Sequence, residues 1–167
     1  MATGFQQSVN LQQAPAIAGD FASANPRSSV VGHEGTFVAG AAGLTLGRFG
    51  WEVNGLVSNT GTGIPTGFLH RRQAAALITT YLAETSNLVP PGFEVTLMKD
   101  GDYWVEITVA AATKGQKVFA SLTTGQVQPG AAGATIAGYV ETNFYIASFP
   151  TGGTGAVGEL AVMSRLY

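Results

Sequence analysis

Apolar and polar residues alternate in short runs along most of this chain, and glycine, proline and asparagine separate the runs. From Ser28 onward the runs are rich in β-branched and aromatic residues, which strands favour. Short runs spaced by turn residues are expected of a barrel or sandwich. The pattern therefore predicts an all-β fold, a small β-barrel or a jelly-roll-like sandwich with about eight to ten strands.

Turn residues between apolar runs predict hairpins. Asn54-Gly55 lies between two such runs, and Asn-Gly is favoured where both central turn residues need positive φ. Residues 94–98 lead through 99–102 into 103–109, which has much of the alternation of a half-buried strand. We expect these last two runs to pair, more firmly than any others in the chain.

A third predicted hairpin joins residues 117–122 to 126–127, and further strands are expected at 134–139, 143–149 and 160–166. Residues 71–84 are ambiguous, because an alanine-rich run that favours helix precedes β-branched residues that favour strand. The interpretations are a short helix that continues as a strand and a strand throughout; we favour the strand.

Residues 1–29 differ from the rest of the chain. Glutamines alternate there with small residues, and Pro15 and Pro26 interrupt any long regular element. We therefore predict an extended N-terminal arm over residues 1–29 and a β-barrel domain over residues 30–167. Apolar residues nevertheless recur along the arm at Phe5, Val9, Leu11, Ile17 and Phe21.

An arm with this apolar content is suited to ordering on a surface rather than to permanent solvation. That surface is a partner protein, the chain's own barrel or, by arm exchange, a neighbouring copy. The sequence leaves these alternatives open.

Charged residues make up 11% of the 167 residues, where about 25% is usual. Binding to a phosphate backbone requires clustered Lys and Arg, and a chain with a net charge of −2 offers little such positive charge. Nucleic acid is therefore not an expected partner. The N-terminus lacks the pattern of a secretory signal, and no run approaches the length of a membrane span. We expect a soluble product made in a cytoplasm, with no membrane partner.

Candidate chemistry is sparse. Cysteine is absent, and the two histidines, His33 and His70, are isolated from any ligand spacing, so no metal site is expected. The glycine-rich residues 61–67 depart from a dinucleotide loop, and there is no Gly-x-Ser-x-Gly elbow. We predict no catalytic residue and no cofactor, which favours binding or scaffolding over an enzyme.

Several short sequence strings occur in this chain in the same order as in a known protein family. Gly19-Asp20-Phe21-Ala22-Ser23-Ala24-Asn25-Pro26-Arg27 is followed by the strings at 37–40, 44–49, 57–61, 67–71, 77–84, 91–97 and 101–105. Together they resemble the structural cement proteins of tailed bacteriophages over roughly residues 15–125, and residues 141–148 and 158–160 are similar too.

The resemblance implies a capsid decoration protein that binds the major capsid protein on the outside of an assembled phage shell. It implies a virion location after synthesis in the bacterial host cytoplasm. We expect the arm to lie across neighbouring capsid subunits and the barrel over their junction. Symmetric sites on a shell favour a homo-oligomer, with a trimer preferred over a dimer.

Nine residues are candidates for capsid or oligomer contacts. The arm contributes Phe21 as an anchor, Pro26 as a residue that keeps its neighbourhood extended, and Arg27 as a partner for a carboxylate. Their alternative role is docking the arm onto its own barrel. The full set is Asp20, Phe21, Asn25, Pro26, Arg27, Arg48, Trp51, His70 and Arg71.

The last four of these are the less specific candidates, because Trp51 equally suits a core and the basic residues equally suit a solvated surface. Two other functions remain as alternatives. One is a carbohydrate-binding β-module or host-adhesion domain of the virion, since jelly-roll folds often serve as lectins. The other, least favoured, is an enzyme with a dispersed carboxylate site.

Overall fold

The computed structural model describes residues 16–32, 36–71, 87–150 and 154–165. Every regular element in these ranges is a strand, which confirms the all-β prediction. The helix-or-strand question for residues 71–84 falls, beyond Arg71 itself, outside the described residues. The same holds for residues 1–15 of the predicted arm.

The strands are short, apart from one of ten residues. In chain order they are β1 (Ser28–Ser29), β2 (Phe37–Ala39), β3 (Leu44–Thr45), β4 (Phe49–Val53), β5 (Leu56–Ser58), β6 (Gly67–Leu69), β7 (Leu88–Val89), β8 (Glu94–Val95), β9 (Leu97–Asp100), β10 (Asp102–Glu106), β11 (Ala112–Thr113), β12 (Lys117–Ser121), β13 (Val127–Gly130), β14 (Tyr139–Ser148), β15 (Thr154–Gly155) and β16 (Leu160–Ser164).

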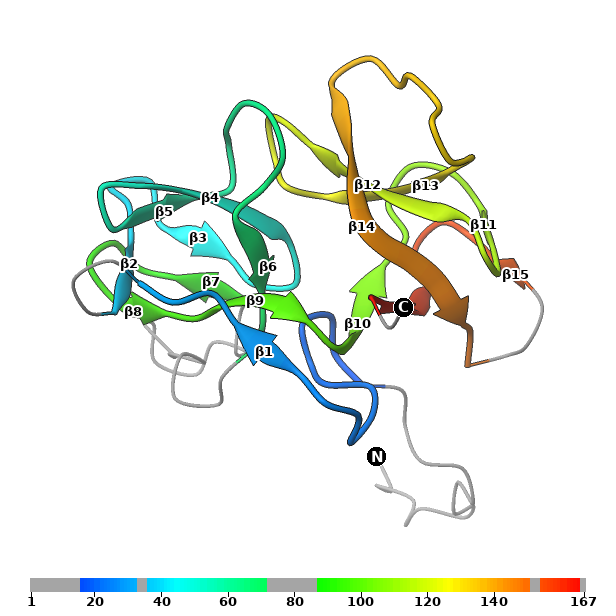
Figure 1. The fold of residues 1–167 in the computed structure, drawn as a ribbon, viewed down its shortest axis with the longest axis horizontal. Helices are drawn as coiled ribbons and strands as arrows, with labels where there is room; N and C mark the ends of the chain where they lie inside the picture. Colours follow the sequence, from blue (N-terminus) through cyan, green and yellow to red (C-terminus); the bar gives the residue numbers. More distant parts are fainter. Residues whose placement is uncertain (1–15, 33–35, 72–86, 151–153, 166–167) are drawn as a thin grey trace, which may run out of the picture.

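Two lobes are visible in Figure 1, an N-terminal lobe with β1 to β9 and a C-terminal lobe with β10 to β16. The N-terminal lobe contains a seven-stranded sheet of order β1-β9-β6-β4-β5-β2-β8 and the small pair β3-β7. The C-terminal lobe contains a five-stranded sheet of order β10-β16-β14-β12-β13 and the small pair β11-β15. None of these described sheets closes into a barrel, so of the two predicted architectures the sandwich is the compatible one.

Two of the predicted hairpins are confirmed. β4 and β5 pair with Val53 opposite Leu56, and Asn54 and Gly55 between them have φ of 53° and 80°. Both are positive, as a tight Asn-Gly turn requires. β12 and β13 form the second hairpin.

The pairing of residues 94–98 with 103–109 is wrong. β9 and β10 follow each other with only Gly101 between them, yet they belong to different sheets. Gly101 has φ of 127°, where a side chain would meet the Tyr103 hydroxyl at 2.7 Å. The Asp-Gly-Asp sequence therefore turns the chain from one lobe into the other rather than back along the same sheet.

The strand predicted at 134–139 is also wrong except at its last residue, because β14 begins at Tyr139. Gly133 and Gly138 both have positive φ, and the amides of Ala134 and Tyr139 donate to the carbonyls three residues earlier, at Ala131 and Ile136. Consecutive turns thus replace an extended run, although the small and β-branched side chains of this segment suit a strand.

The seven-stranded sheet is buried on both faces where it meets the C-terminal lobe. Successive strand residues point to opposite faces. In β6, Phe68 therefore packs into the core shared by the two lobes, while its neighbour Leu69 packs into a second core confined to the N-terminal lobe. In β9, Met98 and Leu97 divide in the same way. β6 and β9 thus form the wall between two cores.

An aromatic cluster joins the lobes at this wall. The ring of Phe68 lies 5.4 Å from that of Phe49 and 5.1 Å from that of Tyr103, and Phe144 of β14 lies 6.2 Å from Tyr103. Ring centroids at these separations attract one another beyond the burial of their area. The two sheets are therefore packed as one unit.

Candidate functional site

Residues 16–29, which we call the strap, lie along the junction of the two lobes. The Gly19 and Ala22 amides donate to the Trp104 and Asp102 carbonyls at 2.8 and 2.9 Å, and the Trp104 amide donates to the Asp20 carbonyl at 2.9 Å. β1, at the end of the strap, pairs with β9. The strap therefore covers the edge of β10 in one sheet and extends the other sheet past β9.

Two glycines allow the strap to cross the body closely. Gly19 has φ of 97°, and a Cβ there would lie 3.0 Å from the Gly47 amide nitrogen. A Cβ on Gly47, with φ of 73°, would lie 2.9 Å from the Ala18 carbonyl carbon. Both positions need positive φ and have no room for a side chain, so these glycines fix where the strap crosses.

A buried carboxylate holds the middle of the strap. Asp102, 9% exposed, accepts hydrogen bonds from the Ser23 hydroxyl and the Asn25 side-chain amide, both at 2.6 Å. Burial raises the pKa of this carboxyl, but hydrogen bonds with Ser164, Ser23 and Asn25 outweigh burial and hold the pKa below its ordinary value. Asp102 is therefore ionised at neutral pH and ties the strap to both β10 and β16.

A stack of side chains covers the aromatic cluster beside this carboxylate. The Phe21 ring stacks on His70 with centroids 4.3 Å apart, and the Arg27 guanidinium carbon lies 3.7 Å from the Phe21 centroid on the ring face. Phe21 also contacts Tyr103, at 5.6 Å. Phe21 thus packs on the chain's own body, and its role as a capsid anchor stays a prediction.

An ion pair secures the start of the strap. Arg71 Nη1 lies 3.4 Å from Asp20 Oδ1, and the Arg71 amide donates to the Gly19 carbonyl at 2.8 Å. Both charged side chains are partly exposed. Their pairing joins residues that the sequence analysis selected separately, one from the arm and one after β6.

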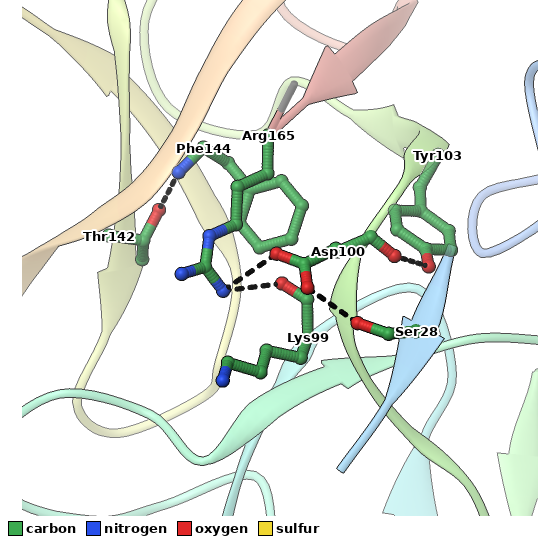
Figure 2. A network of polar contacts seen from close by, with 7 residues as sticks. All are labelled: Ser28, Lys99, Asp100, Tyr103, Thr142, Phe144 and Arg165. Atoms are coloured by element: carbon green, nitrogen blue, oxygen red, sulfur yellow. Dashed lines mark hydrogen bonds and ion pairs between the residues drawn. The ribbon is translucent and has the colours of Figure 1, made fainter. Parts of the chain in front are cut away.

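A second ion pair closes the junction at the end of the strap, and Figure 2 shows it from close by. Arg165 Nη1 lies 3.0 Å from Asp100 Oδ1 and donates to the Lys99 carbonyl at 2.8 Å. The other oxygen of Asp100 accepts a hydrogen bond from the Ser28 hydroxyl. One carboxylate thus connects β9, β1 and the residue that follows β16.

The remaining candidates lie elsewhere or face solvent. Pro26 is exposed on the strap. Trp51 is 5% exposed and fills the shared core, with its indole nitrogen donating to the Gly63 carbonyl at 3.0 Å. Arg48 donates a long hydrogen bond of 3.4 Å to the Thr124 carbonyl, in the turn after β12. The structure therefore gathers Asp20, Phe21, Asn25, Arg27, His70 and Arg71 and leaves Pro26, Arg48 and Trp51 apart.

Comparison with known proteins identifies the family. Residues 5–164 match the family model described as XM1 gp53 minor capsid protein. The chain belongs to this minor capsid protein family. The resemblance to tailed-phage capsid-associated proteins that the sequence strings carry is thereby confirmed. Membership assigns the chain a structural role in the phage capsid and so a place in the virion.

A solved structure has the same fold as this minor capsid family member. A chain in "The capsid of Myoviridae Phage XM1" superposes with a TM-score of 0.62 at 18% sequence identity, and the match covers 96% of each chain. A search of the curated proteins found no match.

Two negative findings concern the described ranges alone. They contain no helix long and apolar enough to cross a bilayer. They also contain no group of three or more His, Cys, Asp or Glu side chains that could hold a metal ion.

Three polar residues that organise the junction were missed by sequence reasoning: Asp100, Asp102 and Arg165. A signal was present, since two carboxylates flank one glycine in a chain with only 11% charged residues. That string predicts a hairpin turn. Asp102 instead accepts a hydrogen bond from Ser23, 79 positions away in the sequence, and Asp100 accepts one from Ser28, 72 positions away.

Proposed function

We propose that this minor capsid protein is a cement, or decoration, protein. It binds the outer surface of an assembled shell of major capsid protein and stabilises the shell by bridging neighbouring capsomers. The observation that carries the proposal is the match to a minor capsid protein family over residues 5–164, nearly the whole chain. In this proposal the protein acts by binding alone, without catalysis or cofactor, and nucleic acid is not a partner.

The architecture suits a bridge. Two sheets packed through one aromatic cluster make a stiff body, and a body that keeps its shape can hold two neighbours at a fixed spacing. Each further contact made by a tethered module gains from a high effective concentration, so individually weak contacts add up to strong attachment. A low charge content also suits an interface, whose centre is usually depleted in Lys, Glu and Asp.

The contacts of the strap bear on which part of the arm we propose as the shell contact. Asp20, Asn25 and Phe21 are engaged with the chain's own body. We therefore assign the shell contact of the arm to residues before the strap, where Phe5, Val9 and Leu11 supply apolar anchors. Only Pro26 and the outer face of Arg27 extend this contact from the strap itself.

A deletion of residues 2–13 tests the proposal. The strap and its glycine crossing remain, so we expect an unchanged unfolding midpoint in urea. Binding to purified shells that lack the protein, measured by co-sedimentation, should fall at least tenfold, because a set of apolar contacts is lost. The full chain is the matched control. Full-strength binding by the deletion variant would discard the arm mechanism, and failure of the full chain to bind shells would discard the cement function.

The proposal includes a homo-oligomer, with a trimer preferred over a dimer, because shells present symmetric sites. It also includes synthesis in the host cytoplasm before attachment to the outside of the shell. Light scattering of the purified protein measures the copy number directly. A monomer at every concentration would remove the oligomer from the proposal and leave the shell contact to be tested separately.

A further inference from the structure

A groove of about 490 Å³ opens at the junction of the lobes, around Arg48. One wall is the β3-β7 pair, from which Thr45 and Leu88 contribute, and Pro90 and Pro91 continue it. The turn after β5 and the turn after β12 form the other side, with Asn59 and Thr124. This volume lies within the range of about 300–1,000 Å³ that small-ligand pockets have.

The floor of the groove is fixed by the backbone. The Leu69 amide donates to the Arg48 carbonyl at 2.8 Å, and the next amide, that of Phe49, donates to the Gly125 carbonyl at 2.8 Å. Asn59 accepts from the Thr45 amide at 2.7 Å and donates to the Phe49 carbonyl at 3.0 Å. The residues around Arg48 are therefore held in place before any ligand arrives.

Of the described residues that line the groove, Arg48 is the one that carries a charge. Within the described ranges both ion pairs use other arginines, Arg71 and Arg165. The guanidinium of Arg48 donates a single long hydrogen bond, to the Thr124 carbonyl at 3.4 Å. A guanidinium has five N–H donors, so several remain for a ligand that reaches Arg48 from the groove. Arg48 also borders a smaller pocket that Glu106 lines, but the described lining of the groove itself contains this one positive charge and no acidic residue.

We propose that this groove receives a carboxylate from an extended segment of the shell protein, with Arg48 as its partner. The inference rests on the proposed cement function, which supplies a protein lattice as the ligand. Arginine pairs with carboxylates in a two-pronged geometry that fixes direction as well as position. Pro90, Pro91 and Leu88 give an apolar wall for the neighbouring side chains of such a segment.

Two other ligand classes fit the groove less well. The lining residues that the structure describes include no aromatic ring on which a sugar could stack, although their hydroxyls could bond a sugar. A single cation also gives little affinity for nucleic acid, which requires several phosphate contacts. A protein carboxylate needs only one strong partner and a shaped wall, and the groove offers both.

The test uses the full chain and purified shells that lack it. Arg48→Met keeps much of the side-chain length and removes the charge; we expect binding measured by co-sedimentation to fall at least tenfold. This is the loss expected when one partner of a buried charge pair is removed. Lys114→Met is the matched control, because Lys114 is an exposed cation in the turn between β11 and β12. It should bind as the unaltered chain does.

Arg48→Lys gives a positive identification. A carbodiimide joins an amine to a carboxylate only where the two are in contact, so the amine introduced at position 48 should link to one acidic residue of the shell protein. Mass spectrometry of the linked peptides then names that residue. The native Lys99, Lys114 and Lys117 serve as internal references in the same sample.

Each outcome decides the inference. Tenfold weaker binding by Arg48→Met together with a position-48 link to a shell carboxylate supports it. Equal binding by Arg48→Met and the unaltered chain overturns it and leaves the cement function standing, as does a link only to another copy of this chain. If the unaltered chain itself fails to bind shells, the cement function and this inference both fall.

Discussion

The two lobes bury their sheets differently. The seven-stranded sheet of the N-terminal lobe has a core on each side at β6 and β9, one of its own and one shared with the other lobe. The five-stranded sheet of the C-terminal lobe contributes to the shared core. In its longest strand, β14, the buried residues Thr142, Phe144 and Ile146 alternate with residues that are exposed or half-buried. The N-terminal sheet thus lies between two hydrophobic cores, whereas the C-terminal sheet faces one, although β12 is buried on both faces, with Phe119 on the side away from that core.

Exposed apolar side chains follow the same division. Of the large hydrophobic residues that are exposed in the described ranges, only Val109 and Val157 belong to the C-terminal lobe. The others are Ile17, Val31, Val53, Leu56, Ile64, Leu88 and Phe93. All nine sequence candidates also precede β7. Within the described ranges, the N-terminal lobe therefore carries most of the exposed large apolar side chains.

Removing a ring from the wall should have the largest effect. Phe68 is fully buried and contacts aromatic residues of both lobes. We expect Phe68→Ala to lower the free energy of unfolding by about 3–5 kcal/mol. In urea, fluorescence from Trp51 in one lobe and Trp104 in the other should shift together. Separate transitions for single-tryptophan variants would show that the lobes unfold independently.

A glycine at the contact between the lobes should come next. Gly125 has φ of 66°, and a Cβ there would lie 2.2 Å from the Phe49 carbonyl oxygen of the N-terminal lobe. We expect Gly125→Ala to cost about 3 kcal/mol, from strain and overpacking together. Gly133→Ala is the matched control, with φ of 72° and open space around it; it should cost about 1 kcal/mol. Equal losses in thermal unfolding would contradict the close packing of the lobes.

The carboxylate that ties the strap should give a smaller, pH-dependent effect. Asp102→Asn exchanges an ionised acceptor for a neutral group and should cost about 1.5–3 kcal/mol at pH 7. Because the folded pKa of Asp102 lies below its ordinary value, its stabilisation is present above about pH 4 and is lost as the pH falls through the folded pKa.

The unfolding free energies of Asp102→Asn and the unaltered chain should therefore converge as the pH falls below about 4 and through the folded pKa. Urea titrations at a series of pH values measure this. A constant difference down to pH 2 would mean that the ionised form of Asp102 does not stabilise the fold. Hydrogen exchange at the Ala22 amide, which donates to the Asp102 carbonyl, should show that the strap is the segment loosened.

The exposed ion pair of the strap should matter least. Arg71 and Asp20 lie 3.4 Å apart with both side chains partly exposed, and such pairs contribute about 0–1 kcal/mol. We expect Arg71→Met to change the unfolding midpoint only slightly and to lose even that difference in 1 M salt, where screening is nearly complete. A loss as large as that of Asp102→Asn would show that the start of the strap, rather than its middle, holds it in place.

The sequence predicted local features of the fold correctly. The Asn54-Gly55 turn and the β12-β13 hairpin follow from residues next to each other, because a turn type depends on a few φ values. The all-β class follows from the period of the pattern in the same way. The family strings also identified the capsid relationship that the family model confirms.

What the sequence did not predict was the partner of each strand. The alternation in β9 and β10 marks both as half-buried strands but carries no information about which sheet each joins, and the Asp-Gly-Asp turn fits a hairpin and a change of sheet equally. The strap contacts were left open for the same reason. Ser23 and Asn25 lie 79 and 77 positions before Asp102 in the sequence, so they contact it only in the folded chain.

The strap is bonded to both lobes at its start, because Gly19 and Asp20 bond with Trp104 of β10 and with Arg71 after β6, and it pairs with β9 near its end. A pull on the chain ahead of Ala16 is therefore shared between the two lobes at once. A tether joined there would hold the whole body rather than peel away a single strand.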